Sequence, residues 1–378
     1  MRIAYLCVDP GVPVFGRKGS SVHVQEMLRA LRALGHEPAL YCARVGGEAP
    51  ADLADVPVLE RRIRGEAGAE RERDTADAAA ELALAAIADG CDLVYERYAL
   101  FSEAAAIVAR TADVPSVLEV NAPLIDEQAR HRVLDDREGA ELATRTSLRA
   151  ASTAVCVSRP VERWAREHGA PRTVVLPNGV DVQRFAPAAH APTERPTVVF
   201  VGTLKPWHGV DRLLEAAVGL PLRLLIVGDG PEGPALRERA QRLGLDAEFT
   251  GAVEPAAIPG LLRRADLAAA PYPGGEEDYF SPLKVFEYLA AGLPVVASAT
   301  GQIPSLLRDG ATGVLVPAGD VPALRAALAE LAADPAARAR MGAEARAEAV
   351  REHDWRRVAQ AALDAATGAS ARLVGSPS

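Results

Sequence analysis

The sequence has 378 residues, about two and a half times the usual domain length of roughly 150, so we expect two domains. It is 49% hydrophobic and 25% charged, and it contains no apolar run long enough to cross a bilayer. The net charge of −9 argues against a nucleic-acid partner or a general binder of anionic membranes, because both need a broad basic surface. The first apolar stretch ends at Asp9 and Pro10, so we expect no secretory signal.

Lysine is rare in this sequence. Of the 42 Lys and Arg residues, only Lys18, Lys205 and Lys284 are lysine. Each lies in a loop or at the expected start of a helix, where free N–H groups and the helix dipole favour a phosphate. Lysine is also common in exposed loops of no special function. The lysines alone therefore leave a phosphate site and plain solvent exposure both open.

The four cysteines form no C-x-x-C pair, and all but Cys91 lie within apolar, strand-like segments. This pattern predicts buried free thiols rather than disulfides or a metal site. Free thiols are typical of a reducing compartment, so we expect a cytoplasmic protein.

The first half of the chain alternates short apolar segments with helical patterns, which is typical of strands buried in a parallel sheet. After the first strand, Ser20 or Ser21 can cap a helix that Gly35 ends. An Ala-rich helix follows a charged stretch and ends near Asp89. The expected strands are residues 2–8, 38–42, 92–96, 115–120 and 153–158.

The second half repeats this alternation after a stretch rich in Pro and Ala. We expect a first domain over residues 1–185, a linker over 186–196, a second domain over 197–353, and a C-terminal helix with a disordered tail over 354–378. That helix is expected to cross back to the first domain. Both domains are predicted to be doubly wound, Rossmann-like α/β folds, which bind ligands at the carboxyl ends of their strands. The expected strands of the second half are residues 197–204, 222–228, 247–251, 266–272, 294–298 and 312–318.

One motif indicates a different ligand. Gly228, Gly230 and Gly233 form a G-x-G-x-x-G pattern between a strand and a helix, as in dinucleotide-binding sites. However, Asp229 would place a carboxylate in the pyrophosphate turn, and Pro231 removes one N–H donor. The motif also follows the second strand of its domain rather than the first. We therefore interpret it as a tight turn beside another ligand and not as an NAD site.

Several segments, in one consistent order, resemble retaining glycosyltransferases of family 4. They include GSSVHVQEMLRALRALGHEP, VVLPNGVDVQRFAP, FVGTLKPWHGVDRLLEA, LLIVGDGPE and SPLKVFEYLAAGLPVVAS. The resemblance implies the GT-B fold, in which two Rossmann-like domains face each other across a cleft. It also implies that the second domain binds a sugar nucleotide and the first domain binds the acceptor.

The resemblance places most of the donor site in the second domain. It implies that Glu287 holds the ribose, whose two hydroxyls suit the two oxygens of a carboxylate; a surface glutamate with an i,i+4 partner is the alternative. The other donor-binding residues that the resemblance implies are Ser281, Pro282, Leu283 and Lys284 at a helix start, Gly19 and Ser20 in the first domain, and Gly228 and Val253 near the base. For Gly228, a plain tight turn with no ligand contact is an equally compatible alternative.

This chain departs from the family pattern at several positions. Thr203 and His208 stand where many members carry Arg and Lys, so Lys205 is the expected replacement cation. His208 can donate one hydrogen bond or serve only in packing. The paired glutamates of the family would require Glu at position 279, where this chain has Tyr279. The sugar hydroxyls are instead expected to meet Asp278 or the backbone near Phe280.

In the first domain, Asn121 aligns with a histidine that often occurs in the family, so we expect no catalytic histidine there. Asn121 is expected to orient the transferred sugar, with a loop cap as the alternative. Arg97 is expected either to reach the acceptor or to form a structural salt bridge. The expected catalytic residues are Lys205, Lys284, Asn121 and Glu287.

Together these features predict retaining transfer from a nucleoside-diphosphate sugar, most simply a UDP-sugar, to a soluble small-molecule acceptor. Cations near the leaving diphosphate would stabilise its developing charge, and the leaving phosphate can take the acceptor's proton. We therefore expect no metal and no cofactor, since no cluster has the spacing of metal ligands. Residues 127–150 have mixed charge and no aromatic side chain, which predicts at most peripheral contact with a membrane. The oligomeric state stays open.

Three other functions are compatible with parts of the pattern. A sugar-nucleotide epimerase of GT-B fold would convert the donor with no acceptor present. A non-catalytic, two-lobed binding protein would carry a signal peptide and would not need Glu287 beside a phosphate loop. An NAD oxidoreductase would change the fluorescence of NADH on binding.

Overall fold

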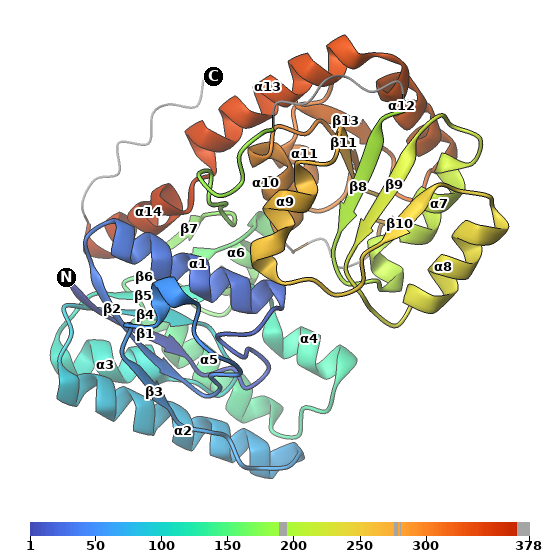
Figure 1. Ribbon diagram of the computed structural model, residues 1–378. Coiled ribbons are helices and arrows are strands. Elements are labelled where there is room, and N and C mark those ends of the chain that lie inside the picture. Colours follow the sequence, from blue (N-terminus) through green and yellow to red (C-terminus); the bar gives the residue numbers. More distant parts are fainter. Residues whose placement is uncertain (189–194, 276–278, 280, 369–378) are drawn as a thin grey trace. The chain divides into compact units, whose positions relative to one another are not determined.

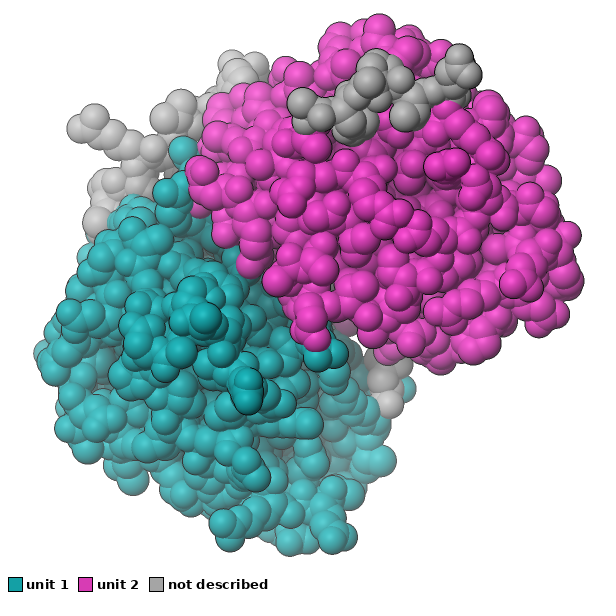
Figure 2. Space-filling model, viewed as in Figure 1, with its two compact units in different colours: residues 1–177, 355–378 teal, residues 178–354 magenta. Residues whose placement is uncertain are grey.

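The computed structural model describes all residues except 189–194, 276–278, 280 and 369–378. The chain divides into two compact units (Figures 1 and 2). Unit 1 consists of Met1–Pro177 and Trp355–Ser378, and unit 2 consists of Asn178–Asp354. Each unit is an α/β fold built on one parallel sheet.

The sheet of unit 1 has the strand order β3-β2-β1-β4-β5-β6-β7. The chain begins at β1, moves outward to β3 and then returns to β4 on the other side of β1, so this sheet is doubly wound. Its strands are β1 (Arg2–Cys7), β2 (Glu37–Cys42), β3 (Val58–Glu60), β4 (Leu93–Arg97), β5 (Ser116–Val120), β6 (Thr153–Cys156) and β7 (Thr173–Val175).

Helices connect these strands and cover the sheet of unit 1 (Figure 1). Ala79 and Ala105 on two of them pack with Leu6 and Val94 of the sheet, because small side chains let a helix lie close to a strand. The helices are α1 (Gly19–Ala33), the 3₁₀ turn η1 (Ala51–Leu53), α2 (Gly68–Asp89), α3 (Ala104–Ala112), α4 (Leu124–His131), α5 (Arg137–Ala150), α6 (Arg159–Glu167) and α14 (Trp355–Thr367).

The sheet of unit 2 has the strand order β10-β9-β8-β11-β12-β13. Successive side chains bury both faces: Val198 and Leu224 belong to one core cluster, and Val199 and Leu225 belong to the other. This burial explains why the strands are almost wholly apolar. They are β8 (Thr197–Val201), β9 (Arg223–Val227), β10 (Ala247–Phe249), β11 (Leu267–Ala270), β12 (Val295–Ser298) and β13 (Gly313–Val316).

The helices of unit 2 lie on both sides of this sheet (Figure 1). They are the 3₁₀ turns η2 (Pro206–His208) and η3 (Pro255–Ala257) and the helices α7 (Val210–Ala217), α8 (Gly233–Arg242), α9 (Ile258–Leu262), α10 (Leu283–Ala290), α11 (Ile303–Leu306), α12 (Val321–Ala333) and α13 (Pro335–Glu352).

The units divide at a different residue from the predicted boundary at 185. Unit 1 ends at Pro177, because Val180, Val182 and Phe185 are buried in the core of unit 2. Most of the predicted linker lies outside the described residues. At the other end, α14 belongs to unit 1, where it packs on α1 and beside β5 and β6.

Two further observations concern features of the whole chain. None of the described helices combines the length and the apolar character needed to cross a membrane. Cys7, Cys42, Cys91 and Cys156 are free thiols, and all but Cys91 are buried, as the sequence predicts.

Candidate functional site

The order of strands in unit 2 reverses at β8. From β8 the chain continues to β9 and β10 on one side, and then returns to β11 on the other. Doubly wound sheets bind ligands at such a reversal, beyond the carboxyl ends of the strands. The loop after β8 carries Thr203, Lys205 and His208, and the turn after β9 begins at Gly228. The structure therefore places these predicted residues where this fold binds ligands.

Lys284 lies in the first turn of α10, and aromatic rings surround its ammonium group. Nζ lies 4.3 Å from the centre of the Phe200 ring and 5.4 Å from the centre of the Tyr272 ring. It is buried and has no hydrogen-bond partner among the described residues. Burial lowers the pKa of Lys284 to about 7, although the charge of Glu287 acts in the opposite direction. The ammonium group thus keeps unused N–H donors.

His208 lies close to two lysines. Burial and the positive charges of Lys284 and Lys205 lower the pKa of His208 to about 4, so its ring is neutral at neutral pH. Nδ1 hydrogen-bonds the carbonyl oxygen of Thr203, which can only accept, so Nδ1 carries the proton. His208 thus donates to the protein's own backbone, and Nε2 is an acceptor in this state. A hydrogen bond from His208 to the donor stays a prediction.

Lys205 precedes the 3₁₀ turn η2, where it is half-buried. Its Nζ lies 4.5 Å from the centre of the Trp207 ring, and that ring is exposed. No ion pair is described for Lys205. Together with Lys284, it supplies positive charge at the strand reversal of unit 2.

The glycine turn after β9 is pressed against the loop after β8. A Cβ at Gly228 would lie 2.1 Å from the Gly202 oxygen, and a Cβ at Gly230 would lie 2.5 Å from the Leu204 oxygen. The N–H of Gly228 donates to the Gly251 carbonyl at 3.1 Å, and the N–H of Gly230 donates to the Asp229 carboxylate at 2.8 Å. Both N–H groups therefore already have acceptors within the protein, where a pyrophosphate site would need them free.

The segment after β10 lies beside this turn. Gly228 and Gly251 form a β-bridge, and Thr250 donates its hydroxyl proton to the Gly251 carbonyl at 2.9 Å. Val253 follows and packs against the core of unit 2. The structure thus places Gly228 beside Gly251, two residues before Val253 in the segment predicted to lie near the base.

Asn178 holds the segment that precedes α10. Its backbone N–H donates to Ser281 Oγ at 3.1 Å, and its Nδ2 donates to the Ser281 carbonyl at 2.8 Å. Pro282 then precedes α10 and Leu283 is its first residue, which places Glu287 one turn beyond Lys284. Asn178 was not among the predicted site residues, and its only signal in the sequence is its place in the segment VVLPNGVD.

Three predicted residues lie just before this segment. Tyr279 is described and half-buried, whereas Asp278 and Phe280 lie outside the described residues.

In unit 1, the predicted phosphate-facing residues begin a helix. Gly19 is the first residue of α1 and Ser20 the second, after an exposed Lys18 whose side chain caps nothing. Gln25 steadies the preceding loop, since its Nε2 donates to the carbonyls of Val14 and Gly16 at 2.9 and 3.0 Å. The start of α1 is therefore held in place from within its own helix.

A buried carboxylate organises the other predicted residues of unit 1. Glu119 on β5 forms an ion pair with His23 and lies 3.9 Å from Arg97, while Asn121 Nδ2 donates to its Oε1 at 3.0 Å. Tyr95 donates to Oε2 at 2.9 Å. Arg97 thus has the structural ion pair that was one of its two predicted roles. Glu119 itself was not predicted, because nothing in a single apolar strand marks a buried charge as functional.

The environment of Glu119 favours its charged form. Burial alone would raise its pKa, but the charges of His23 and Arg97 and the hydrogen bonds to His23 and Asn121 outweigh that effect. The pKa falls from 4.5 to about 2. Asn121 is therefore anchored to a permanent negative charge.

Within the described part of the chain, no three His, Cys, Asp or Glu side chains are grouped so that they could hold a metal ion.

Two protein-family models match the chain. The model for "Glycosyltransferase Family 4" matches residues 17–184, and the model for "Glycosyl transferases group 1" matches residues 195–334. The chain is 32% identical over 265 residues to the GDP-mannose-dependent alpha-(1-6)-phosphatidylinositol monomannoside mannosyltransferase of Mycolicibacterium smegmatis. This match covers 62% of this chain and 69% of that protein. It is 40% identical over 214 residues to the phosphatidyl-myo-inositol mannosyltransferase of Mycobacterium leprae, covering 54% of this chain and 56% of that protein.

Solved structures agree on the fold. HepE from Anabaena, in complex with UDP, is similar over 97% of this chain and 100% of that chain, with a TM-score of 0.74 and 20% identity. The sucrose-phosphate synthase of Thermosynechococcus elongatus is similar over 96% and 97%, with a TM-score of 0.71 and 22% identity.

The fold is that of a GT-B protein. The chain belongs to the glycosyltransferases of family 4. It matches little more than half the length of the mannosyltransferase from Mycobacterium leprae.

Proposed function

We propose that the protein transfers a sugar, with retention of configuration, from a nucleoside-diphosphate sugar to a hydroxyl of an acceptor. The observation that carries the proposal is the buried ammonium of Lys284, which has no hydrogen-bond partner among the described residues and lies at the strand reversal of unit 2. An ammonium group in this position has N–H donors whose hydrogen bonds a bound anion can accept. A diphosphate supplies one, and Lys205 adds a second positive charge beside it.

The chemistry follows from where the charges lie. As the bond to the sugar breaks, negative charge grows on the departing diphosphate, and Lys284 and Lys205 would stabilise it. The leaving phosphate oxygen then accepts the proton of the attacking hydroxyl on the same face. Glu287 would hold the ribose, and Asn121 would orient the sugar. No step in this scheme requires a metal or a cofactor, so transfer is expected to continue in the presence of a chelator.

The identity of the donor has two candidates. The sequence pattern predicts a UDP-sugar, whereas the name of the Mycolicibacterium smegmatis relative specifies GDP-mannose. That relative shares 32% of its residues over the match, and the UDP complex of HepE has only 20% identity and supports the fold alone. We therefore propose GDP-mannose as the first donor to test and UDP-glucose as the alternative.

The acceptor is also open between two classes. The sequence predicts a soluble acceptor in the cytoplasm, whereas the names of two relatives specify phosphatidylinositol lipids. An acceptor of either class can offer the hydroxyl that the proposed transfer needs. A screen with inositol, inositol phosphate and phosphatidylinositol in vesicles separates them.

The test begins with binding. Titration calorimetry with GDP, UDP and ADP, followed by the matching sugars, identifies the donor. Glu287→Ala should then weaken the preferred nucleotide by about tenfold or more, because each charge-assisted hydrogen bond to the ribose is worth about 1.5–3 kcal/mol. Glu238→Ala is the matched control, since Glu238 lies exposed on α8. If Glu287→Ala retains affinity and turnover within about threefold, the assignment of the donor site is wrong.

Transfer itself is tested with the preferred donor and the acceptor screen. Conversion of the donor sugar to its epimer with no acceptor present would favour an epimerase instead. Binding of sugar nucleotide with no reaction under any condition would favour a non-catalytic binding protein.

A further inference from the structure

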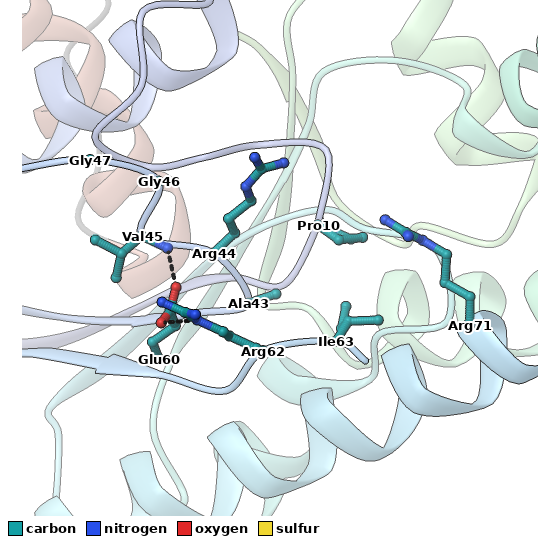
Figure 3. A pocket seen from close by; sticks show the side chains of 10 residues that line it. All are labelled: Pro10, Ala43, Arg44, Val45, Gly46, Gly47, Glu60, Arg62, Ile63 and Arg71. Carbon is teal, nitrogen blue, oxygen red and sulfur yellow. Dashed lines mark hydrogen bonds and ion pairs between the residues drawn. The ribbon is translucent and has the colours of Figure 1, made fainter. Parts of the chain in front are cut away.

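Unit 1 contains a second candidate site, a pocket of about 540 Å³ at the carboxyl ends of β1, β2 and β3 (Figure 3). Every residue that lines it belongs to unit 1. Three arginines contribute to its wall: Arg44 follows β2, Arg62 follows β3, and Arg71 lies in the first turn of α2. Its volume is within the usual range for sites that bind small molecules.

The residues that line this pocket carry more positive than negative charge. Glu60 accepts hydrogen bonds from Arg62 Nε and from the N–H of Val45, both at 2.7 Å (Figure 3). No ion pair or side-chain hydrogen bond is described for Arg44 or Arg71. Three guanidinium groups against one carboxylate leave two positive charges, in a chain whose net charge is −9.

The backbone of the pocket adds free donors. The N–H groups of Gly46 and Gly47 have no hydrogen-bond partner in the described part of the chain. Gly46 has a φ of +86°, and a Cβ there would lie 2.2 Å from Pro13 Cβ, so no larger residue fits. The loop is also fixed in place, because the Val14 and Phe15 N–H groups donate to the Arg44 and Val45 carbonyls at 2.9 and 2.8 Å.

We propose that this pocket binds a phosphate group carried by the acceptor. The proposal rests on the proposed function and on the expectation, from the sequence, that the first domain binds the acceptor. A phosphate carries between one and two negative charges at neutral pH, which matches the two unbalanced positive charges. Guanidinium groups bind phosphate oxygens through paired N–H donors, and the glycine N–H groups can complete the shell. Pro10, Val45 and Ile63 supply apolar wall for the rest of the ligand.

The pocket lies apart from Asn121, which directly follows β5 and is proposed to orient the transferred sugar. β2 and β5 are separated by β1 and β4, which places them roughly 14 Å apart at the usual spacing of strands. The phosphate would therefore bind away from the reacting hydroxyl. Its contacts should contribute to acceptor affinity equally in the ground state and the transition state, so their loss should raise KM and leave kcat nearly unchanged.

Direct binding tests this without any catalysis. The full chain is titrated with glycerol 3-phosphate, with glycerol, and with phosphatidylcholine vesicles that do or do not contain phosphatidylglycerol. Arg71→Gln should weaken binding of the phosphate-bearing probe by about tenfold. The double variant Arg44→Gln/Arg71→Gln should weaken it by more than tenfold. Arg73→Gln is the matched control, because Arg73 lies on the same helix, is exposed and does not line the pocket.

The outcomes separate the sources of the phosphate. Arginine-dependent binding of glycerol 3-phosphate supports a soluble phosphate ester, and arginine-dependent binding only of the phosphatidylglycerol vesicles supports a lipid head group. Equal binding by the double variant and the wild type, or an equal loss in Arg73→Gln, overturns the proposal. An unchanged KM of the double variant for a phosphate-bearing acceptor would also overturn the proposal. If no nucleotide sugar is ever transferred but the arginine-dependent binding persists, the proposed function fails and the anion site does not.

Discussion

The ammonium nitrogen of Lys284 lies 4.3 Å from the centre of the Phe200 ring. Phe200 is on β8 and Lys284 is on α10, so the contact joins a strand and a helix at the reversal of the unit 2 sheet. Attraction to an aromatic ring is worth about 0.5–2 kcal/mol, which replaces only part of the hydration that a buried ammonium loses. The charged form of Lys284 is therefore unfavourable in the free protein, and a bound anion would stabilise it.

Affinity for a nucleoside diphosphate should fall as the pH rises above about 7. The pKa of Lys284 is about 7 in the free protein, and a bound diphosphate would raise it, so binding takes up a proton at higher pH. We expect the dissociation constant to increase up to about tenfold per pH unit between about pH 7 and pH 9. Calorimetry in buffers of different ionisation enthalpy measures the proton directly. In Lys284→Arg, which stays charged, this dependence should disappear; a wild-type affinity that is flat over this range contradicts the prediction.

Replacing Lys284 with methionine should stabilise the free protein although it removes donor binding. The unfolded chain keeps this lysine protonated up to its ordinary pKa of 10.5, whereas the folded chain releases the proton at about 7. The penalty for the charge is thus greatest below pH 7 and disappears as the pH approaches about 10.5. We expect Lys284→Met to raise the free energy of unfolding by about 2–4 kcal/mol near pH 7.

Denaturant unfolding at neutral and at alkaline pH checks this. Lys18→Met is the control, because Lys18 is exposed and should leave stability unchanged. A destabilised Lys284→Met variant at neutral pH would mean that the ammonium already has adequate partners.

The Glu119 carboxylate should govern the acid stability of unit 1. Its folded pKa lies below its ordinary value, so its contribution is complete above about pH 4.5 and is lost as the pH falls towards about 2. Glu119→Gln removes this contribution and leaves His23 and Arg97 without their carboxylate. We expect a loss of about 3 kcal/mol at neutral pH and a flatter acid unfolding curve.

Acid titration of both proteins by circular dichroism measures the difference. Glu141→Gln is a suitable control, since Glu141 pairs with arginines at the surface of α5. Equal stability of Glu119→Gln and the wild type at neutral pH, with parallel acid curves, would show that the buried ion pair contributes nothing.

The sequence was sufficient to predict the two doubly wound sheets, because their strands are buried on both faces and read as continuous apolar segments. It was not sufficient for β3 and β7, which are short and only partly buried, so no long apolar segment marks them. The positions of Lys205, Lys284 and Gly228 followed from the family pattern. Their neighbours, such as Phe200 beside Lys284 and Gly202 beside Gly228, come from distant parts of the chain. The spacing of residues in a single sequence contains no information about such contacts.

The turn at Gly228 gives the final prediction, because two backbone loops touch there. Gly228 has a φ of +128°, and a Cβ would lie 2.1 Å from the Gly202 oxygen. Gly228→Ala must therefore push the loop after β8 away from the turn after β9, which should cost about 2–4 kcal/mol of stability and displace Lys205 and His208. Gly244→Ala is the matched control, since Gly244 also has a positive φ of +65° but has no atom within 4 Å of an added Cβ. That control should lose about 1 kcal/mol and keep its affinity for the nucleotide. If the two variants lose equal stability and both bind nucleotide normally, then backbone conformation alone matters at Gly228 and the close approach of the loops does not position the donor site.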